Sequence, residues 1–125
     1  MEAISRGSVV IVSVPGDYGK PRPAVVIQHT RLLQILDSVV LALLTTSPEG
    51  GERIRIRVEP DAANGLRATS RVMTDKLFTL QRHRVGEAIG ELDAVSMAKV
   101  DNALRTLLDL EPTAITTPPA AEEQP

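Results

Sequence analysis

Hydrophobic residues in the first eighty positions fall into short runs, which are typical of β-strands. Residues 9–14 form a β-branched run, and residues 24–28 form a second apolar segment. Residues 38–46 are apolar without alternation, which predicts a strand buried on both faces. A further strand is predicted over residues 70–80. Residues 29–36 indicate only a short helical turn or loop.

Arginine alternates with aliphatic residues from Arg53 to Val58, the clearest period-two pattern in the chain. In a strand, this alternation turns Ile54, Ile56 and Val58 to one side and the arginines to the other. Two interpretations fit equally well. The arginines form either the solvated face of an ordinary amphipathic strand or a row of cations that faces a polyanion.

A helix is predicted from about Ala94 to Leu110, after Asp93, which can cap its first turn. Apolar residues recur there at spacings of three and four, giving one face to bury in the core or against a second copy of the chain. These residues are Met97, Val100, Leu104, Leu107 and Leu108. Strands joined by short turns and followed by one long helix predict an α+β protein with a mostly antiparallel, barrel-like sheet.

The chain divides into a folded part, residues 1–110, and a tail, residues 111–125, that we expect to be disordered. The tail combines acidic residues with prolines and offers no hydrophobic face. The 125 residues suffice for one domain with a single core. Because no apolar run approaches the ~20 residues of a membrane span and cysteine is absent, we expect a cytoplasmic protein without disulfides.

Charge is unevenly distributed along the chain. The formal net charge is -2, yet the segment from Lys20 to Arg84 holds eleven basic and six acidic residues, a local charge of +5. A basic body of this kind favours an anionic partner, whereas the sequence pI of about 5.7 argues against a general nucleic-acid coat.

The basic segment at residues 16–23 runs directly into the second predicted strand. Gly16 and Gly19 can adopt positive φ and let the backbone approach a ligand closely. Prolines on both sides of Arg22 restrict its backbone, and Pro23 disfavours helical geometry for the residue before it. An arginine held in this way loses less entropy when its planar guanidinium binds a phosphate. The alternative is a proline-stiffened turn whose arginine is merely solvated.

Several catalytic arrangements are missing from the sequence. Only His29 and His83 are present, at no metal-ligand spacing, and there is no H-E-x-x-H motif. The chain also lacks a phosphate-binding P-loop, a dinucleotide-binding glycine pattern and the G-x-S-x-G nucleophile elbow. Arginine, threonine, lysine and aspartate remain, and these residue types suit the stabilisation of a phosphoryl transition state.

A series of segments over residues 6–110 resembles the MazF/PemK family of type II toxin–antitoxin toxins. In order they read R-G-S-V-V-I-V, G-K-P-R-P-A-V-V-I, L-L-T-T-S, S-R-V-M-T-D-K, I-G-E-L-D and V-D-N-A-L. The resemblance implies a small SH3-like antiparallel β-barrel with a long C-terminal helix, the CcdB/PemK-like fold, assembled as a homodimer. It also implies a metal-independent endoribonuclease without cofactors, an mRNA interferase that cuts single-stranded RNA and is bound by a cognate antitoxin.

The resemblance assigns catalysis to Arg22, between the two prolines, and to Thr45 in the L-L-T-T-S segment. Asp75-Lys76 stands where the family has an Asp-Gln pair, and lysine only donates hydrogen bonds where glutamine also accepts them. Simpler roles are open: Thr45 could bond local backbone groups, and Asp75 could pair with a nearby arginine such as Arg71 or Arg53. The residues expected to bind RNA are Tyr18, Gly19, Lys20, Arg53, Arg55, Asp75 and Lys76.

The expected reaction is attack of an RNA 2′-OH on the adjacent phosphate, giving a 2′,3′-cyclic phosphate and a 5′-OH end. Arg22 would neutralise the charge that develops on the phosphoryl oxygens, although a guanidinium pKa above ~12 makes it a poor base. Thr45 would bond a phosphate oxygen or position the leaving group.

Two other functions stay open. A non-catalytic toxin on the same fold, like the CcdB toxins that bind DNA gyrase, would act through a tryptophan near the C-terminus, and the chain has no tryptophan. A plain binding module would present its basic face to an acidic protein. Incubation with RNA separates these classes, because only the enzyme produces cuts.

Overall fold

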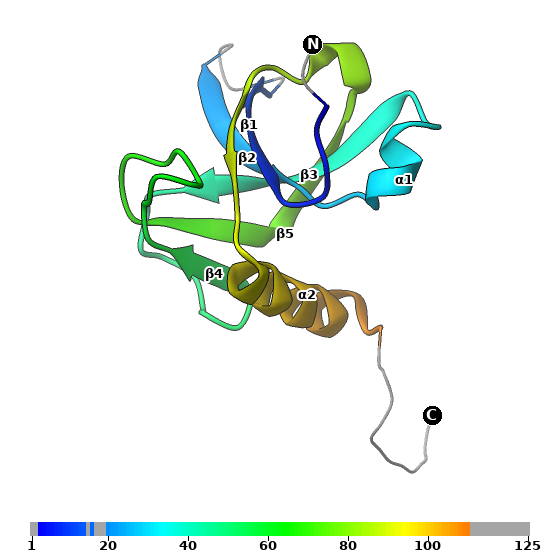
Figure 1. The fold of residues 1–125 in the computed structure, drawn as a ribbon. Helices are drawn as coiled ribbons and strands as arrows, with labels where there is room; N and C mark the ends of the chain where they lie inside the picture. Colours follow the sequence, from blue (N-terminus) through cyan, green and yellow to red (C-terminus); the bar gives the residue numbers. More distant parts are fainter. Residues whose placement is uncertain (1–2, 15, 17–19, 111–125) are drawn as a thin grey trace, which may run out of the picture.

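The structure is a computed structural model that describes residues 3–14, 16 and 20–110 (Figure 1). Its strands are β1 (Ser8–Ser13), β2 (Pro21–Val26), β3 (Ser38–Thr45), β4 (Arg55–Val58), β5 (Ser70–Gln81) and β6 (Ala88–Glu91). Its helices are α1 (Thr30–Leu33), the 3-10 helix η1 (Arg82–Arg84) and α2 (Ala94–Leu108). The predicted tail, residues 111–125, lies outside the described residues. No helix in the described ranges is long and apolar enough to cross a membrane.

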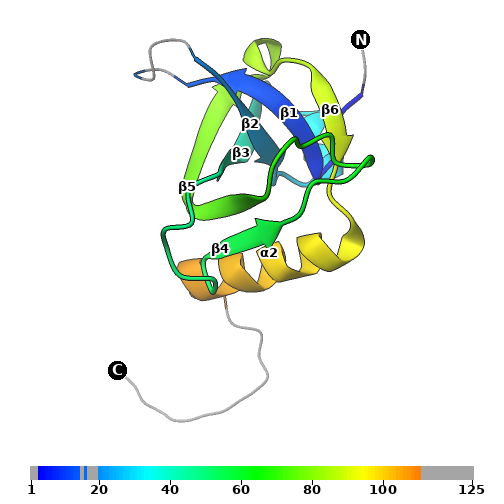
Figure 2. The same cartoon turned by 90° about the vertical axis from the view of Figure 1, so that its left-hand side faces the viewer.

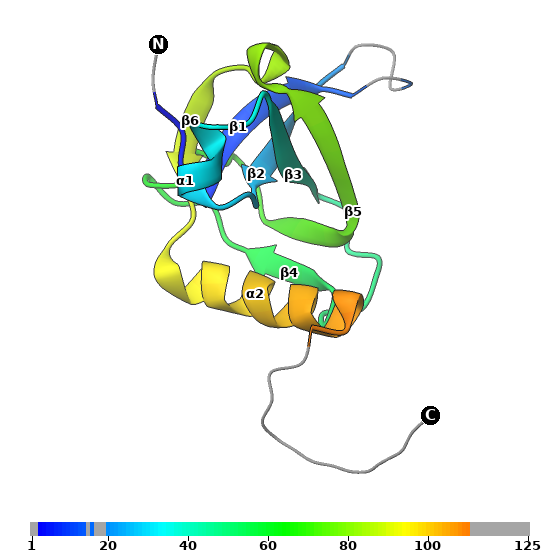
Figure 3. The ribbon, with the colours of Figure 1, turned by 90° about the vertical axis from the view of Figure 1, so that its right-hand side faces the viewer.

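The strands form one antiparallel sheet in the order β4-β5-β3-β2-β1-β6. The sheet curls into an incomplete barrel, and α2 lies beside β4 (Figures 2 and 3). The segment between β4 and β5 reaches the opposite edge, where Ala63 O accepts a hydrogen bond from the Glu91 amide at 2.9 Å. These features confirm the predicted α+β class, with an antiparallel, barrel-like sheet and a C-terminal helix.

Two glycines permit the close backbone contact at this junction. Gly65 has a φ of +71°, and a Cβ at this position would lie 2.2 Å from the carbonyl oxygen of Ile89. A Cβ at Gly90 would lie 2.3 Å from the carbonyl oxygen of Ala63. Both distances are far below van der Waals contact, so a side chain at either position would push β6 away from the turn.

The hydrophobic core is divided by the sheet into two clusters. The first cluster lies between the sheet and α2 and includes the fully buried Val100. The second includes Leu33 of α1. Because side chains alternate across a strand, β3 supplies both clusters, which confirms the prediction of a strand buried on both faces. Its buried residues are Ala42 and Leu44 in the first cluster and Val39 and Leu41 in the second.

The helix α2 begins at the predicted cap. Asp93 Oδ1 accepts a hydrogen bond from the Ser96 amide at 2.7 Å, and this bond holds the pKa of the Asp93 carboxyl below its ordinary value. Val100 is fully buried, whereas Leu107 and Leu108 are 39% and 50% exposed. The predicted apolar face is therefore buried only in its first part, and the helix ends two residues before its predicted end.

The larger differences from the predictions concern β2, β4 and β6. β2 begins at Pro21 and ends at Val26. It starts earlier than predicted because residues 21–23 pair with β1, although the described pairs with β3 begin only at Ala24. Prolines are tolerated where one side of a strand has no ladder partner. β4 begins at Arg55 rather than Arg53. The short strand β6 has Gly90 near its centre, and its hydrophobic pattern does not predict it.

Candidate active site at the end of the sheet

Polar side chains from neighbouring strands stand side by side where β3 ends. Thr45, the last residue of β3, faces Arg71 of β5. Arg71 in turn faces Arg57 of β4. Facing residues of antiparallel strands project to the same side of the sheet. A hydroxyl and two guanidinium groups therefore share one side of the sheet at this end.

Arg22 continues this line onto β2. The described pairing of β2 with β3 ends at Ala24 opposite Leu43, and Arg22 and Thr45 lie two residues beyond this pair on the two strands. Because side chains alternate along a strand, both project to the same side of the sheet as Ala24 and Leu43. Arg22 is half-buried, and its extended backbone agrees with the restriction that Pro23 imposes on it. The two predicted catalytic residues therefore lie on adjacent strands and on one side of the sheet. We call the line of Arg22, Thr45, Arg71 and Arg57 the cross-strand row.

Thr45 is held by a local hydrogen bond. Its Oγ1 accepts the amide proton of Ser47 at 3.1 Å, and the residue is half-buried. This bond confirms the simpler role considered for Thr45, the satisfaction of a nearby backbone group. It also fixes the position of the oxygen while leaving the hydroxyl its own proton to donate, because a hydroxyl group donates and accepts at once.

A bend in β5 exposes the predicted Asp75-Lys76 pair. β3 and β5 are paired at Ala42↔Leu77 and again at Leu44↔Val72. These two pairs are two residues apart on β3 but five residues apart on β5. The three additional residues of β5 have no counterpart on β3, and Figure 3 shows the strand turning sharply along its length. The bend leaves Asp75 and Lys76 exposed at the surface.

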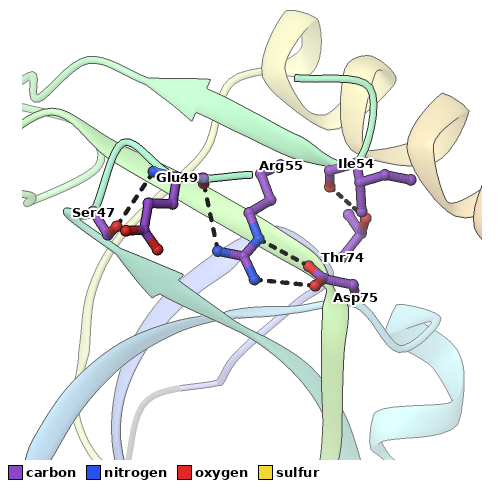
Figure 4. Close-up of polar contacts among 6 residues, drawn as sticks. All are labelled: Ser47, Glu49, Ile54, Arg55, Thr74 and Asp75. Carbon is purple, nitrogen blue, oxygen red and sulfur yellow. Dashed lines mark hydrogen bonds and ion pairs between the residues drawn. The ribbon is translucent and has the colours of Figure 1, made fainter. Parts of the chain in front are cut away.

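Asp75 is bound by Arg55 in a bidentate ion pair (Figure 4). Arg55 Nε and Nη2 donate to the two carboxylate oxygens of Asp75 at 3.1 and 3.0 Å. The hydrogen bonds from Arg55 lower the pKa of the Asp75 carboxyl, and the same bonds raise the pKa of Arg55. Asp75 is therefore paired, but its partner is Arg55, whereas the sequence suggested Arg71 or Arg53.

Arg55 also holds the loop that follows Thr45. Its Nη1 lies 3.5 Å from the carbonyl oxygen of Glu49, the far limit of a hydrogen bond. Gly50 has a φ of +96° and packs on the same side chain, since a Cβ there would lie 2.5 Å from Arg55 Cδ. Figure 4 shows the guanidinium between the loop and β5. Arg55 is thus a bridge that joins the end of β3 to the bend of β5.

The predicted row of cations along β4 is largely neutralised. Arg55 is paired with Asp75, and Arg57 Nη2 lies 2.7 Å from Glu59 Oε2. A hydrogen bond from Thr69 and the charge of Arg57 lower the pKa of the Glu59 carboxyl. Further guanidinium groups at this end of the molecule belong to the other strands, Arg22 on β2 and Arg71 on β5.

The remaining predicted RNA-binding residues fall into two groups. Lys20, directly before β2, and Arg53, two residues before the start of β4, are exposed. Tyr18 and Gly19 lie outside the described residues. Arg71 is the member of the cross-strand row to which no sequence pattern gives a part in binding RNA. The S-R-V-M-T-D-K segment contains it, but only the strand register shows that it faces Thr45.

The described residues contain no group of three or more His, Asp or Glu side chains that is placed to hold a metal ion. The cross-strand row itself supplies guanidinium groups and a hydroxyl. Guanidinium groups bind phosphate through paired N–H donors, and a fixed hydroxyl can donate one further hydrogen bond to it. This arrangement suits a phosphodiester.

Comparisons with known proteins found similar chains. The family model described as "PemK-like, MazF-like toxin of type II toxin-antitoxin system" matches residues 5–108. A curated relative from Mycolicibacterium smegmatis, "Probable endoribonuclease MazF", is 36% identical over 106 residues, which are 84% of this chain and 96% of the relative.

Solved structures show the same fold. The Mycobacterium tuberculosis toxin MazF-mt6 is 27% identical, with a TM-score of 0.72 over 83% of this chain and 98% of that chain. An endoribonuclease in complex with its cognate antitoxin, from a mycobacterial species, has a TM-score of 0.76 over 89% of this chain and 100% of that chain. Its identity of 24% supports the likeness in fold alone.

Proposed function

The chain belongs to the PemK-like, MazF-like toxin family of type II toxin–antitoxin systems, and we propose that it is an endoribonuclease toxin that cuts single-stranded RNA at the cross-strand row. The 36% identical relative named as an endoribonuclease supports this activity. A CcdB-like toxin that binds DNA gyrase is the weaker alternative, because the chain has no tryptophan to act as its contact residue.

The placement of Arg22 and Thr45 on adjacent strands and on one side of the sheet carries this proposal. They lie on adjacent strands, and the register of β2 and β3 puts them on the same side of the sheet. A half-buried guanidinium beside a fixed hydroxyl can bind the non-bridging oxygens of one phosphate from two directions. Both residues are set in strands rather than loops, and such positions are held more rigidly.

The proposed reaction follows from this placement. The 2′ oxygen of the RNA forms a bond to phosphorus and loses its proton, while the bond from phosphorus to the 5′ oxygen breaks and that oxygen gains a proton. Arg22 stabilises the negative charge that grows on the phosphoryl oxygens. Thr45 donates a hydrogen bond to the phosphate while Ser47 holds its oxygen. DNA lacks the attacking hydroxyl, so it would bind without being cut.

The wider RNA path would use the exposed cations around the row. We propose that Lys20, Arg53 and Lys76 bind phosphates, and that Asp75, oriented by Arg55, accepts a hydrogen bond from a base. Phosphate contacts position a nucleic acid, and contacts to base edges specify its sequence. Asp75 would therefore affect which sequences are cut, whereas the lysines would affect the affinity for every sequence.

The family membership also implies partners. We propose that the chain forms a homodimer and that a cognate antitoxin binds it, with an acidic segment placed over the basic cross-strand row. The exposed Leu107 and Leu108 of α2 are available for contact with a second protein chain. Because its proposed substrate is messenger RNA, we expect the protein to act in the cytoplasm.

Cleavage of RNA without divalent metal is the direct test. The purified chain is incubated with a long single-stranded RNA in the presence of EDTA, and the ends of the fragments are mapped. We expect cuts at discrete sites with 5′-OH and cyclic phosphate ends, and no cuts in DNA of the same sequence. Intact RNA after prolonged incubation, from protein shown to be folded, would exclude the enzyme and favour the binding toxins.

A further inference from the structure

Arg71 has a buried cationic group that the described chain does not satisfy. Its side chain is 15% exposed. Its Nη1 is buried and has no hydrogen-bond partner among the described residues. The acidic group beside it is Glu52 Oε2, 3.7 Å from Nη1, which is too far for a hydrogen bond. Buried guanidinium donors are normally hydrogen-bonded, so the position of Arg71 needs an explanation.

The surroundings of Arg71 add positive charge rather than remove it. Arg57 faces Arg71 directly across β4 and β5, and like charges in facing positions destabilise a sheet. Arg57 has its own partner in Glu59, at 2.7 Å. Glu52 is left as the acidic partner of Arg71, and its side chain is 74% exposed. The carboxylate is thus held loosely enough to be displaced by another anion.

The position of Arg71 identifies that anion. Thr45 lies between Arg71 on β5 and Arg22 on β2, and all three project to the same side of the sheet. Adjacent paired strands are about 4.8 Å apart, so β2 and β5 are separated by roughly 10 Å where both pair with β3. Two long side chains at this separation can bind two phosphates of one RNA strand on either side of the hydroxyl.

We propose that Arg71 binds the RNA phosphate next to the scissile one, and that Glu52 occupies the place of this phosphate when RNA is absent. This phosphate subsite rests on the proposed RNA cleavage and assigns a residue to the neighbouring nucleotide. Binding of RNA exchanges the long contact with Glu52 for direct hydrogen bonds to phosphate, which satisfies Nη1. Glu52 is therefore a competitor of the substrate, and Arg71 is a binding residue rather than a scaffold for the fold.

Binding of an uncleavable RNA tests the subsite. The probe is a fluorescein-labelled single-stranded RNA of mixed sequence with 2′-fluoro groups, which lacks the attacking hydroxyl. Its affinity is measured by fluorescence anisotropy over a range of salt concentrations for the unaltered chain and for Arg71→Gln, Arg71→Lys and Glu52→Gln. Two variants serve as matched controls: Arg105→Gln on α2, and Glu91→Gln on β6, at the other edge of the sheet.

We expect Arg71→Gln to weaken binding about tenfold or more, the effect of losing a hydrogen bond to a charged group. The slope of log affinity against log salt should become shallower by about 0.7, the value for one phosphate contact on a single strand. Arg71→Lys should keep the slope, because it keeps the charge. Glu52→Gln should tighten binding about two- to fivefold, the effect of removing an exposed competing ion pair. The two controls should match the unaltered chain.

Unchanged affinity and salt slope in Arg71→Gln would overturn the subsite while leaving RNA cleavage by the unaltered chain intact. If circular dichroism shows that Arg71→Gln does not fold, the RNA affinity of Glu52→Gln provides the test instead. In that case, an affinity of Glu52→Gln no higher than that of Glu91→Gln overturns the proposal. Absence of cleavage by the unaltered chain would instead refute the proposed function. A salt slope that depends on Arg71 would in that case still support an anion-binding site.

Discussion

Removal of the Arg55–Asp75 ion pair should destabilise the fold, and a double-mutant cycle measures by how much. The variants are Arg55→Met, Asp75→Asn and the two together, so that the coupling energy isolates the pair from the other contacts of each side chain. The pair is bidentate, with hydrogen bonds of 3.1 and 3.0 Å. It joins β4 to the bend of β5, and its loss should loosen both.

The expected coupling follows from the geometry and the exposure. Hydrogen bonds to charged groups contribute about 1.5–3 kcal/mol, and exposed ion pairs at most about 1 kcal/mol. The Arg55 and Asp75 side chains are 18% and 33% exposed, between these cases. We therefore expect a coupling of about 1 kcal/mol at neutral pH, after allowance for solvent screening. A loss of this size lowers the melting temperature of a domain of this length by about 4 °C.

The coupling should also depend on pH in a defined direction. Because Arg55 lowers the pKa of Asp75, the folded state binds the proton less readily than the unfolded state. The stabilisation is therefore complete above the unfolded pKa of about 3.9 and is lost as the pH falls through the lower folded pKa. Arg55, whose own pKa is raised, stays protonated throughout this range.

Urea unfolding followed by circular dichroism, at neutral pH and in acid, measures both effects. The exposed pair Arg57–Glu59 is the matched control, since it lies at the same edge of the sheet with a distance of 2.7 Å and side chains that are 58% and 59% exposed. The cycle of Arg57→Met and Glu59→Gln should give no measurable coupling. An Arg55–Asp75 coupling as small as that of the control, or one that persists undiminished in acid, would refute the stabilising role of the pair.

Two further predictions concern the fold. Gly65→Ala should destabilise the protein by about 2 kcal/mol or more, because the residue has a positive φ and its Cβ would collide with the Ile89 carbonyl. The control is Gly51→Ala, where a Cβ meets nothing within 4 Å, and it should be tolerated in the same urea experiment. Val100→Ala should lose about 2 kcal/mol of stability through the buried methyl groups, whereas Val95→Ala, 66% exposed on the same helix, should lose less than about 0.5 kcal/mol. Equal effects at the two valines would contradict the assigned packing of α2.

Much of the fold could be predicted because several elements are specified locally. β1, β3, β5 and α2 each contain enough apolar residues to show their own pattern, and the Asp93 cap marks the start of α2. β6 could not be predicted, because its four residues include Gly90 and its place depends on backbone contact with the segment between β4 and β5. The early start of β2 depends on pairing with β1, which no local pattern of β2 encodes.

The candidate site was predictable only in part. The motifs point to Arg22 and Thr45, and the structure places them on adjacent strands. Arg71 and the partner of Asp75 could not be identified, because both depend on the register of β5. That register changes by three residues at the bend, and such a shift arises from tertiary packing between strands distant in the sequence.

The central claim is that Arg22 and Thr45 act together on one phosphodiester bond. The most direct test is the single-turnover rate of RNA cleavage by Arg22→Ala, Thr45→Val and the double variant, each shown to be folded by circular dichroism. Residues that act as a unit have strongly non-additive effects, so the double variant should be hardly slower than the slower single variant. Near-normal cleavage by Arg22→Ala, or effects of the two substitutions that multiply in full, would contradict a shared site.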